Sequence, residues 1–109
     1  MKENYSSPNG TYTVLFDVFE VRMSHWLEVP RVVRVADQQP LFDLQGDVWS
    51  TSQVTWLTDS QLELQLRKYP GLVSCALLLD FHNGTGQASC GPARFEGTLN
   101  AVQSWVLSH

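Results

Sequence analysis

The sequence has few basic residues and little charge of either sign. Charged residues make up 17% of its 109 residues, below the roughly 25% of an average domain. Seven Lys and Arg residues stand against eleven Asp and Glu, which gives a formal net charge of −4. Low charge combined with a hydrophobic share of 43% excludes disorder for the bulk of the chain.

The shortage of basic residues is greatest in the middle of the chain. No Lys or Arg occurs between Arg34 and Arg67, whereas five acidic residues fall there: Asp37, Asp43, Asp47, Asp59 and Glu63. An acidic midsection repels phosphate, which argues against nucleic acid as a partner. The charge favours a protein with a basic surface, or a small cation. The simpler explanation of the same charges is a solvated acidic face that keeps the protein soluble.

Long apolar runs are missing as well. The longest, from Cys75 to Leu79, has the length of a strand and falls far short of the ~18 residues that a membrane-spanning helix needs. The first seven residues, Met1 to Ser7, lack the apolar core of a signal peptide. We therefore expect a cytoplasmic protein that does not bind a membrane.

Only two cysteines are present, Cys75 and Cys90, on either side of an Asn-Gly-Thr-Gly turn signal. A two-residue turn over residues 83–84 would place Cys90 opposite Leu77. A four-residue loop beginning at the same point would place Cys90 opposite Leu79. Neither register brings the two cysteines together, although a bulge would change the pairing. The expectation is two free thiols in a reducing compartment.

Catalytic and metal-binding motifs are not recognisable in the sequence. The three histidines, His25, His82 and His109, have no metal-ligand spacing. Neither a Gly-x-Ser-x-Gly turn, nor a phosphate loop, nor a His-Glu-x-x-His motif occurs. We therefore predict a protein that is not an enzyme and that uses no metal or cofactor.

The length predicts one domain over residues 1–109, in which residues 1–10 form a loose lead-in. A long strand pattern follows. Tyr12, Val14, Phe16 and Val18 share one face, and from Phe19 onward the apolar residues fall on the other parity. Such a switch indicates a β-bulge or a strand that passes from one sheet to another.

Turn signals divide the rest of the chain into short segments. Further strands are expected over residues 31–36, 41–44, 53–57, 61–69, 73–81 and 87–90, with Pro30 breaking the pairing before the first of them. Segment 61–69 alternates apolar and polar residues, which is typical of a half-buried antiparallel strand. Segment 73–81 is apolar on both parities and predicts a central strand covered on both sides.

Helical spacing occurs only in the tail, over residues 97–108. Leu99, Val102 and Val106 fall on one face, Trp105 widens that stripe, and Thr98 can cap the helix. The sequence therefore predicts a mainly β fold. We expect a small antiparallel β-sandwich or rolled meander of about seven strands with one C-terminal α-helix.

Three phrases in the first part of the chain resemble known repeats. They are Ser-Pro-Asn-Gly-x-Tyr from residue 7, Val-Trp-Ser from residue 48 and Trp-Leu-Thr-Asp-Ser-x-Leu from residue 56. Together they resemble, over residues 6–68, the Ser-Pro-Asp-Gly blades of TolB-like and WD40-like β-propellers. A closed propeller needs four or more blades of roughly 40–45 residues each, so this chain holds two at most. The resemblance implies an antiparallel meander and carries no function.

The densest polar and aromatic stretch precedes Pro30. It contributes four residues to a candidate recognition patch, and two residues further along the chain complete it: Glu20, Arg22, His25, Trp26, Arg67 and Tyr69. Trp, Tyr and Arg are the usual anchors of protein interfaces. An ordinary strand end, in which Glu20 and Arg22 pair with Arg67 and Glu63, accounts for the same residues.

These features favour a non-catalytic protein-binding module. One concrete version is an intracellular inhibitor similar to the immunity proteins that neutralise bacterial toxins. One alternative is a small-molecule binder or small enzyme with a cleft near Arg22, His25 and Arg67. Another is a self-associating protein, a homodimer formed through an exposed edge strand.

Overall fold

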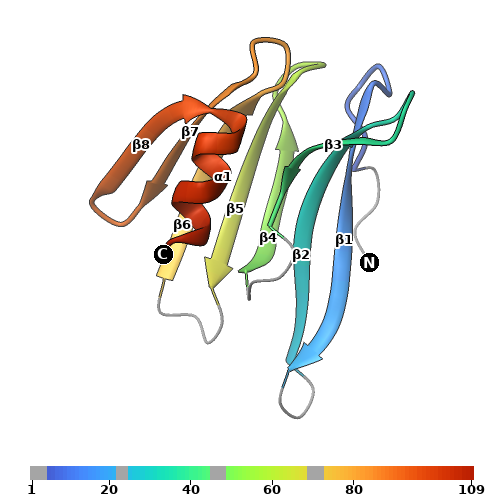
Figure 1. Ribbon diagram of the computed structural model, residues 1–109. Helices are drawn as coiled ribbons and strands as arrows, with labels where there is room; N and C mark the ends of the chain where they lie inside the picture. The colour runs from blue at the N-terminus through green and yellow to red at the C-terminus, as the bar shows by residue number, and fades with distance from the viewer. Residues whose placement is uncertain (1–4, 22–24, 45–48, 69–72) are drawn as a thin grey trace.

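The computed structural model describes residues 5–21, 25–44, 49–68 and 73–109. The chain forms eight strands and then a helix (Figure 1): β1 Tyr12–Val21, β2 His25–Arg34, β3 Gln39–Asp43, β4 Trp49–Trp56, β5 Gln61–Lys68, β6 Val73–Asp80, β7 Thr85–Cys90, β8 Ala93–Thr98 and α1 Leu99–Leu107. The radius of gyration of 13.2 Å is that of a compact domain of this length.

The strands form two antiparallel sheets, ordered β1-β2-β3 and β4-β5-β6-β7-β8. Strand order follows chain order within each sheet, so both are meanders. The sheets meet where β2 passes β4 (Figure 1). There the Glu28 N–H donates to Ser50 Oγ, and Thr51 Oγ1 donates to the Glu28 carbonyl. The predicted mainly β fold with one C-terminal helix is confirmed; β8 is a strand that the sequence did not reveal.

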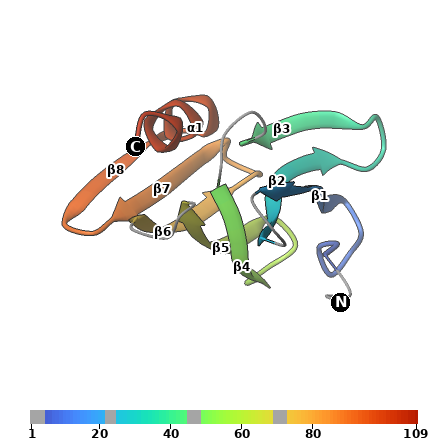
Figure 2. The same cartoon turned by 90° about the horizontal axis from the view of Figure 1, so that it is seen from below.

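Helix α1 lies on one side of the five-stranded sheet, with β3 beside it on that side (Figure 2). The Thr98 side chain accepts a hydrogen bond from the Ala101 N–H at 3.1 Å, as the predicted cap requires. Val102 and Val106 are fully buried. The Gln103 side chain accepts a hydrogen bond from the Asp43 N–H at 2.8 Å and so ties the helix to β3.

Two glycines let the helix approach the sheet. Gly86 on β7 lies opposite Gly97 on β8. A Cβ atom at Gly86 would lie 3.4 Å from Val102 Cγ2 on the helix and 3.0 Å from Leu79 Cδ2 on β6. A Cβ at Gly97 would lie 3.3 Å from the Ala101 Cβ. The absence of side chains here therefore places α1 close against β7 and β8.

One core joins both sheets and the helix. Its largest fully buried side chains include Trp49, Phe42 and Leu64. Toward the N-terminus, the rings of Tyr12 and Phe81 pack with their centroids 5.2 Å apart. Burial of apolar surface from every layer is what holds the two sheets and the helix together.

The predicted bulge or change of sheet at Phe19 is wrong. Pairing between β1 and β2 stays regular from Tyr12 opposite Arg34 to Val21 opposite His25. The face of β1 that carries buried Val14 is exposed farther along the strand, where Val18 is 53% accessible. Val14 and Val32 are buried on one face of the hairpin, whereas Val29 and Leu27 are buried on the other. The buried face therefore changes along the hairpin without a bulge.

Pro30 does not break the pairing, as the sequence had predicted, but lies inside β2 opposite Phe16. The second strand begins at His25 and not at residue 31. The Pro30 carbonyl accepts a hydrogen bond from the Leu44 N–H, and the paired register of β2 with β3 begins at the next residue, Arg31. In an antiparallel strand the N–H and C=O of one residue point to the same side. The position at which Pro30 lacks an N–H therefore faces β3, at the point where the pairing of β2 with β3 ends.

The expectation that β6 is covered on both sides is also wrong. Leu77 and Leu79 are buried in the core, whereas Leu78 between them is 36% exposed. Helix α1 covers only the face that carries Leu77 and Leu79. The opposite face of β6 is open.

The two cysteines form a disulfide between β6 and β7, which contradicts the expected free thiols. Cys75 lies directly opposite Cys90, with their Cα atoms 4.2 Å apart. This short separation is typical of a non-hydrogen-bonded antiparallel pair, where side chains approach most closely. The strands are joined by a four-residue loop over residues 81–84, which begins two residues earlier than the loop expected from the sequence.

Hydrogen bonds to Asp80 fix the position of this loop. Asp80 Oδ1 accepts the backbone N–H groups of His82 and Asn83, each at 3.1 Å. Gly84 ends the loop with φ at +69°, a conformation that glycine adopts without steric cost. These local contacts set the register that brings the cysteines together.

Candidate functional site

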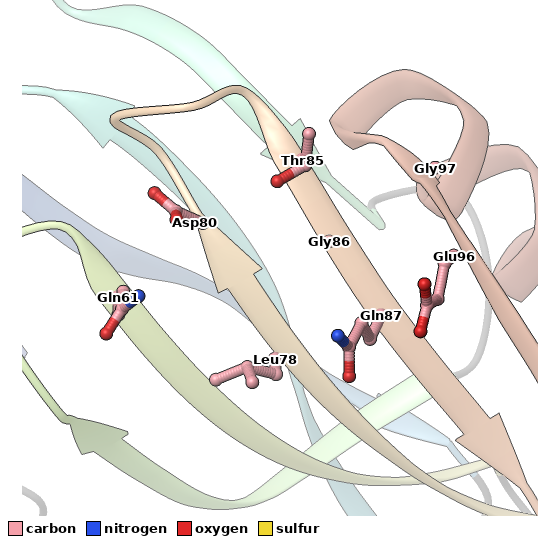
Figure 3. A pocket seen from close by; sticks show the side chains of 8 residues that line it. All are labelled: Gln61, Leu78, Asp80, Thr85, Gly86, Gln87, Glu96 and Gly97. Atoms are coloured by element: carbon pink, nitrogen blue, oxygen red, sulfur yellow. The ribbon is translucent and has the colours of Figure 1, made fainter.

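The face of the five-stranded sheet opposite α1 is the candidate site. Along β6 and β7, buried residues on the helix side alternate with accessible residues on the other side. The accessible side chains carry carboxylates, carboxamides and hydroxyls, with Leu78 among them (Figure 3). This alternation is the expected pattern for an antiparallel sheet with one packed and one solvated face. The helix-free side will be called the open face.

Four residues form a row across the open face. Glu63 on β5 lies opposite Leu78 on β6, Leu78 lies opposite Gln87 on β7, and Gln87 lies opposite Glu96 on β8. Residues paired in this way point to the same side of a sheet. From β5 to β8 the row therefore carries a carboxylate, an apolar residue, a carboxamide and a second carboxylate, and Thr55 on β4 lies opposite Glu63.

A hollow of about 480 Å³ lies beside this row, and Figure 3 shows the side chains that line it. Its lining contains the carboxylates of Asp80 and Glu96 and the carboxamides of Gln61 and Gln87, but neither Lys nor Arg. A second hollow of about 190 Å³ shares part of this lining and adds Glu63 and Arg94. The first hollow therefore presents negative charge and hydrogen-bonding groups around a leucine.

Asp80 has a structural role in the β6–β7 loop besides its place in the hollow. Burial raises the pKa of this carboxyl, but hydrogen bonds from the Asn83 backbone and side chain outweigh that effect. Gln61 and the His82 amide add further hydrogen bonds. The pKa of Asp80 consequently lies below its ordinary value of 3.8, so the side chain is ionised at neutral pH.

We expect the stability that Asp80 contributes to depend on pH. Because the pKa is lower in the folded state, this stability is present above the unfolded pKa of about 4 and is lost as pH falls through the folded pKa. The Asp80→Asn variant should lose this part of the acid dependence and be less stable at neutral pH. Chemical denaturation at neutral pH and at several values below about pH 4 measures both effects.

Two further results complete this test. An Asn83→Ala variant, which removes one hydrogen-bond donor to Asp80, should show a smaller change in the same direction. Identical acid dependence in the wild type and in Asp80→Asn would contradict the stabilising role of the carboxylate.

The carboxylates of the open face lie apart from one another and without His or Cys beside them in the two hollows. The Glu63 and Glu96 carboxylates stand at opposite ends of the row, and neither hollow described above is lined by His or Cys. In the part of the chain that the structure describes, no group of three or more His, Cys, Asp or Glu side chains is placed to hold a metal ion. The carboxylates can attract positively charged groups.

The structure places only part of the recognition patch predicted from the sequence. Glu20 lies near the end of β1, opposite Trp26, and is exposed. Arg67 is exposed on β5, in the other sheet. Arg22 and Tyr69 lie outside the described residues, as do the side chains of His25 and Trp26. The patch, the strand-end pairing and the cleft near Arg22 therefore stay predictions.

Sequence reasoning missed most of the open face. The alternation in segment 61–69 does place Glu63 on the polar side of its strand. Leu78 was expected to be covered, and Glu96 lies on a strand that was not predicted. The alternation Arg94, Phe95, Glu96 was a usable signal for that strand, but Gly97 after it weakens the pattern.

Comparison of the chain with protein-family models, with curated proteins and with solved structures finds no match. The resemblance to propeller blades stays a prediction. Among the described residues, no helix is both long enough and apolar enough to cross a membrane.

Proposed function

We propose that the protein is a non-catalytic protein-binding module that docks a basic surface of another protein on the open face. The observation that carries the proposal is the row in which exposed Leu78 lies between the carboxylates of Glu63 and Glu96. An apolar centre within a polar rim is typical of protein interfaces. The flanking carboxylates favour a basic partner and disfavour an acidic one.

An inhibitor similar to toxin-immunity proteins is one concrete form of this function. Such a protein needs an accessible surface and no catalytic groups of its own. The open face offers such a surface, and the acidic midsection of the chain supports a basic partner.

The disulfide bears on where binding takes place. The sequence predicts a cytoplasmic protein, whereas disulfides persist mainly in oxidising compartments. The Cys75–Cys90 disulfide therefore favours an oxidising compartment for this function. Alkylation of the protein in its native cells, followed by mass spectrometry, would contradict this if both thiols were found free.

Site-specific photo-cross-linking tests the proposed function. Replacement of Gln87 by p-benzoylphenylalanine puts a cross-linker on the open face. The same replacement at Asn100, an exposed carboxamide on α1, is the matched control. In native cells we expect a discrete protein with a basic surface to cross-link at position 87 and not at position 100. The Glu63→Lys and Glu96→Lys variants should abolish that cross-link.

Three outcomes would count against the proposal. Equal cross-linking at both positions, or none at either, would contradict docking on the open face. A cross-link to a second copy of this chain would favour a homodimer instead, and light scattering would then give its size.

A further inference from the structure

We infer that the open face recognises a segment of its partner that carries two cationic side chains about 14 Å apart, with an apolar side chain between them. This inference rests on the proposed function and specifies the partner. It depends on the row formed by Glu63, Leu78, Gln87 and Glu96 and on the hollow beside that row.

The spacing follows from the sheet. Neighbouring strands lie about 4.8 Å apart, and three such steps separate Glu63 on β5 from Glu96 on β8, giving about 14 Å. An extended segment advances about 3.3 Å per residue, so positions i and i+4 lie about 13 Å apart. A segment that crosses the strands with Lys or Arg at these two positions can therefore reach both carboxylates.

The exposed leucine within the row favours an apolar side chain between the two cations of the segment. Leu78 is 36% exposed and belongs to the lining of both hollows. Burial of an apolar side chain against it removes apolar surface from water. The carboxamides of Gln61 and Gln87 can donate to and accept from the backbone of the segment.

Basic residues of this protein limit where the segment can lie. Arg94 precedes Glu96 by two residues on the same face, and Arg67 follows Glu63 by four residues on its strand. Arg94 lines the smaller hollow, whereas the larger one contains no basic residue. Arg94 and Arg67 repel the cations of the segment. The cations are therefore expected to lie at the row itself or on the side of the row that faces the larger hollow.

Peptides of defined sequence test the inference. The probe is acetyl-Lys-Gly-Leu-Gly-Lys-amide, and the matched control is its isomer acetyl-Lys-Lys-Gly-Leu-Gly-amide, which has the same charge and composition. Titration into ¹⁵N-labelled protein should shift amide signals of β5 to β8 around the row, with a dissociation constant in roughly the millimolar range. The isomer should bind about threefold more weakly, because only one of its cations can reach a carboxylate.

Substitutions on the face sharpen the test. Glu63→Gln and Glu96→Gln should each weaken binding of the probe about threefold, and Arg94→Gln should strengthen it about twofold. Asp59→Asn, a change of equal charge in the exposed turn between β4 and β5, should leave binding unchanged. Circular dichroism of each variant checks that the fold is retained.

Equal affinity for the two isomers, or equal affinity of Glu63→Gln, Glu96→Gln and Asp59→Asn for the probe, would overturn the inference. Signal changes concentrated away from β5 to β8 would overturn it as well. A specific cross-link at position 87 combined with equal affinity for the isomers would leave the proposed function standing and reject the dicationic segment. Preference for the probe without any cross-linked protein would reject the proposed function, and with it a partner that carries the segment, and would leave only the charge selectivity of the row.

Discussion

Loss of the Cys75–Cys90 disulfide is expected to lower the free energy of unfolding by about 3 kcal/mol and the melting temperature by roughly 10–20 °C. The bond joins cysteines separated by 15 positions and so restricts the unfolded chain. Domains of this size are stable by only about 5–15 kcal/mol, so the expected loss is a large fraction. Thermal and urea denaturation with and without dithiothreitol measure it.

The Cys75→Ala/Cys90→Ala double variant is the control. Its melting temperature should not respond to dithiothreitol, whereas that of the wild type should fall toward the variant's value. Both cysteines are buried, so the variant also loses some packing and should be slightly less stable than the reduced wild type. An oxidised wild type that melts at the same temperature as the reduced protein would show that the bond has no stabilising role.

The second large effect on stability is expected from truncation of a buried leucine on β6, and its exposed neighbour serves as the comparison. Leu77→Ala should lower the free energy of unfolding by about 2–5 kcal/mol, because Leu77 is 1% exposed and its truncation leaves a cavity in the core. Leu78→Ala, the same chemical change one residue further along, should cost less than about 1 kcal/mol because Leu78 lies on the open face. Urea denaturation of the two variants gives the comparison.

This pair of variants also tests the candidate site. Docking on the open face needs Leu78 to be accessible in the free protein. If Leu78→Ala destabilised the protein as much as Leu77→Ala, the outer side of β6 would be covered and could not bind a partner. A small effect of Leu78→Ala on stability, together with weaker binding of the peptide probe, is the expected combination.

Local patterns were sufficient to predict several elements. Alternation of Leu62, Leu64 and Leu66 with polar residues predicted β5, and the structure buries all three leucines. Thr98 and the apolar stripe that includes Val102 predicted α1. These predictions succeeded because each depends on residues within one strand or one helix, where backbone geometry alone decides which side chains share a face.

The exact strand register and the contacts between distant segments were beyond the same reasoning. The register of the β6–β7 hairpin depends on hydrogen bonds to Asp80 and on the conformation of Gly84, and a shift of two residues was enough to hide the disulfide. The candidate site was missed for a similar reason. Glu63 and Glu96 lie 33 positions apart along the chain, and only the pairing of β5 through β8 puts them in one row.

The sequence by itself therefore determined that this protein is mainly β, is acidic and ends in a helix, because composition and periodicity act locally. Only the tertiary structure decided that the two cysteines pair, that Leu78 is exposed and that two distant carboxylates frame it. Those properties depend on strand register and on which face the helix covers. The register of the β6–β7 hairpin follows from hydrogen bonds within its own loop, and the choice of covered face follows from packing the whole chain around one core.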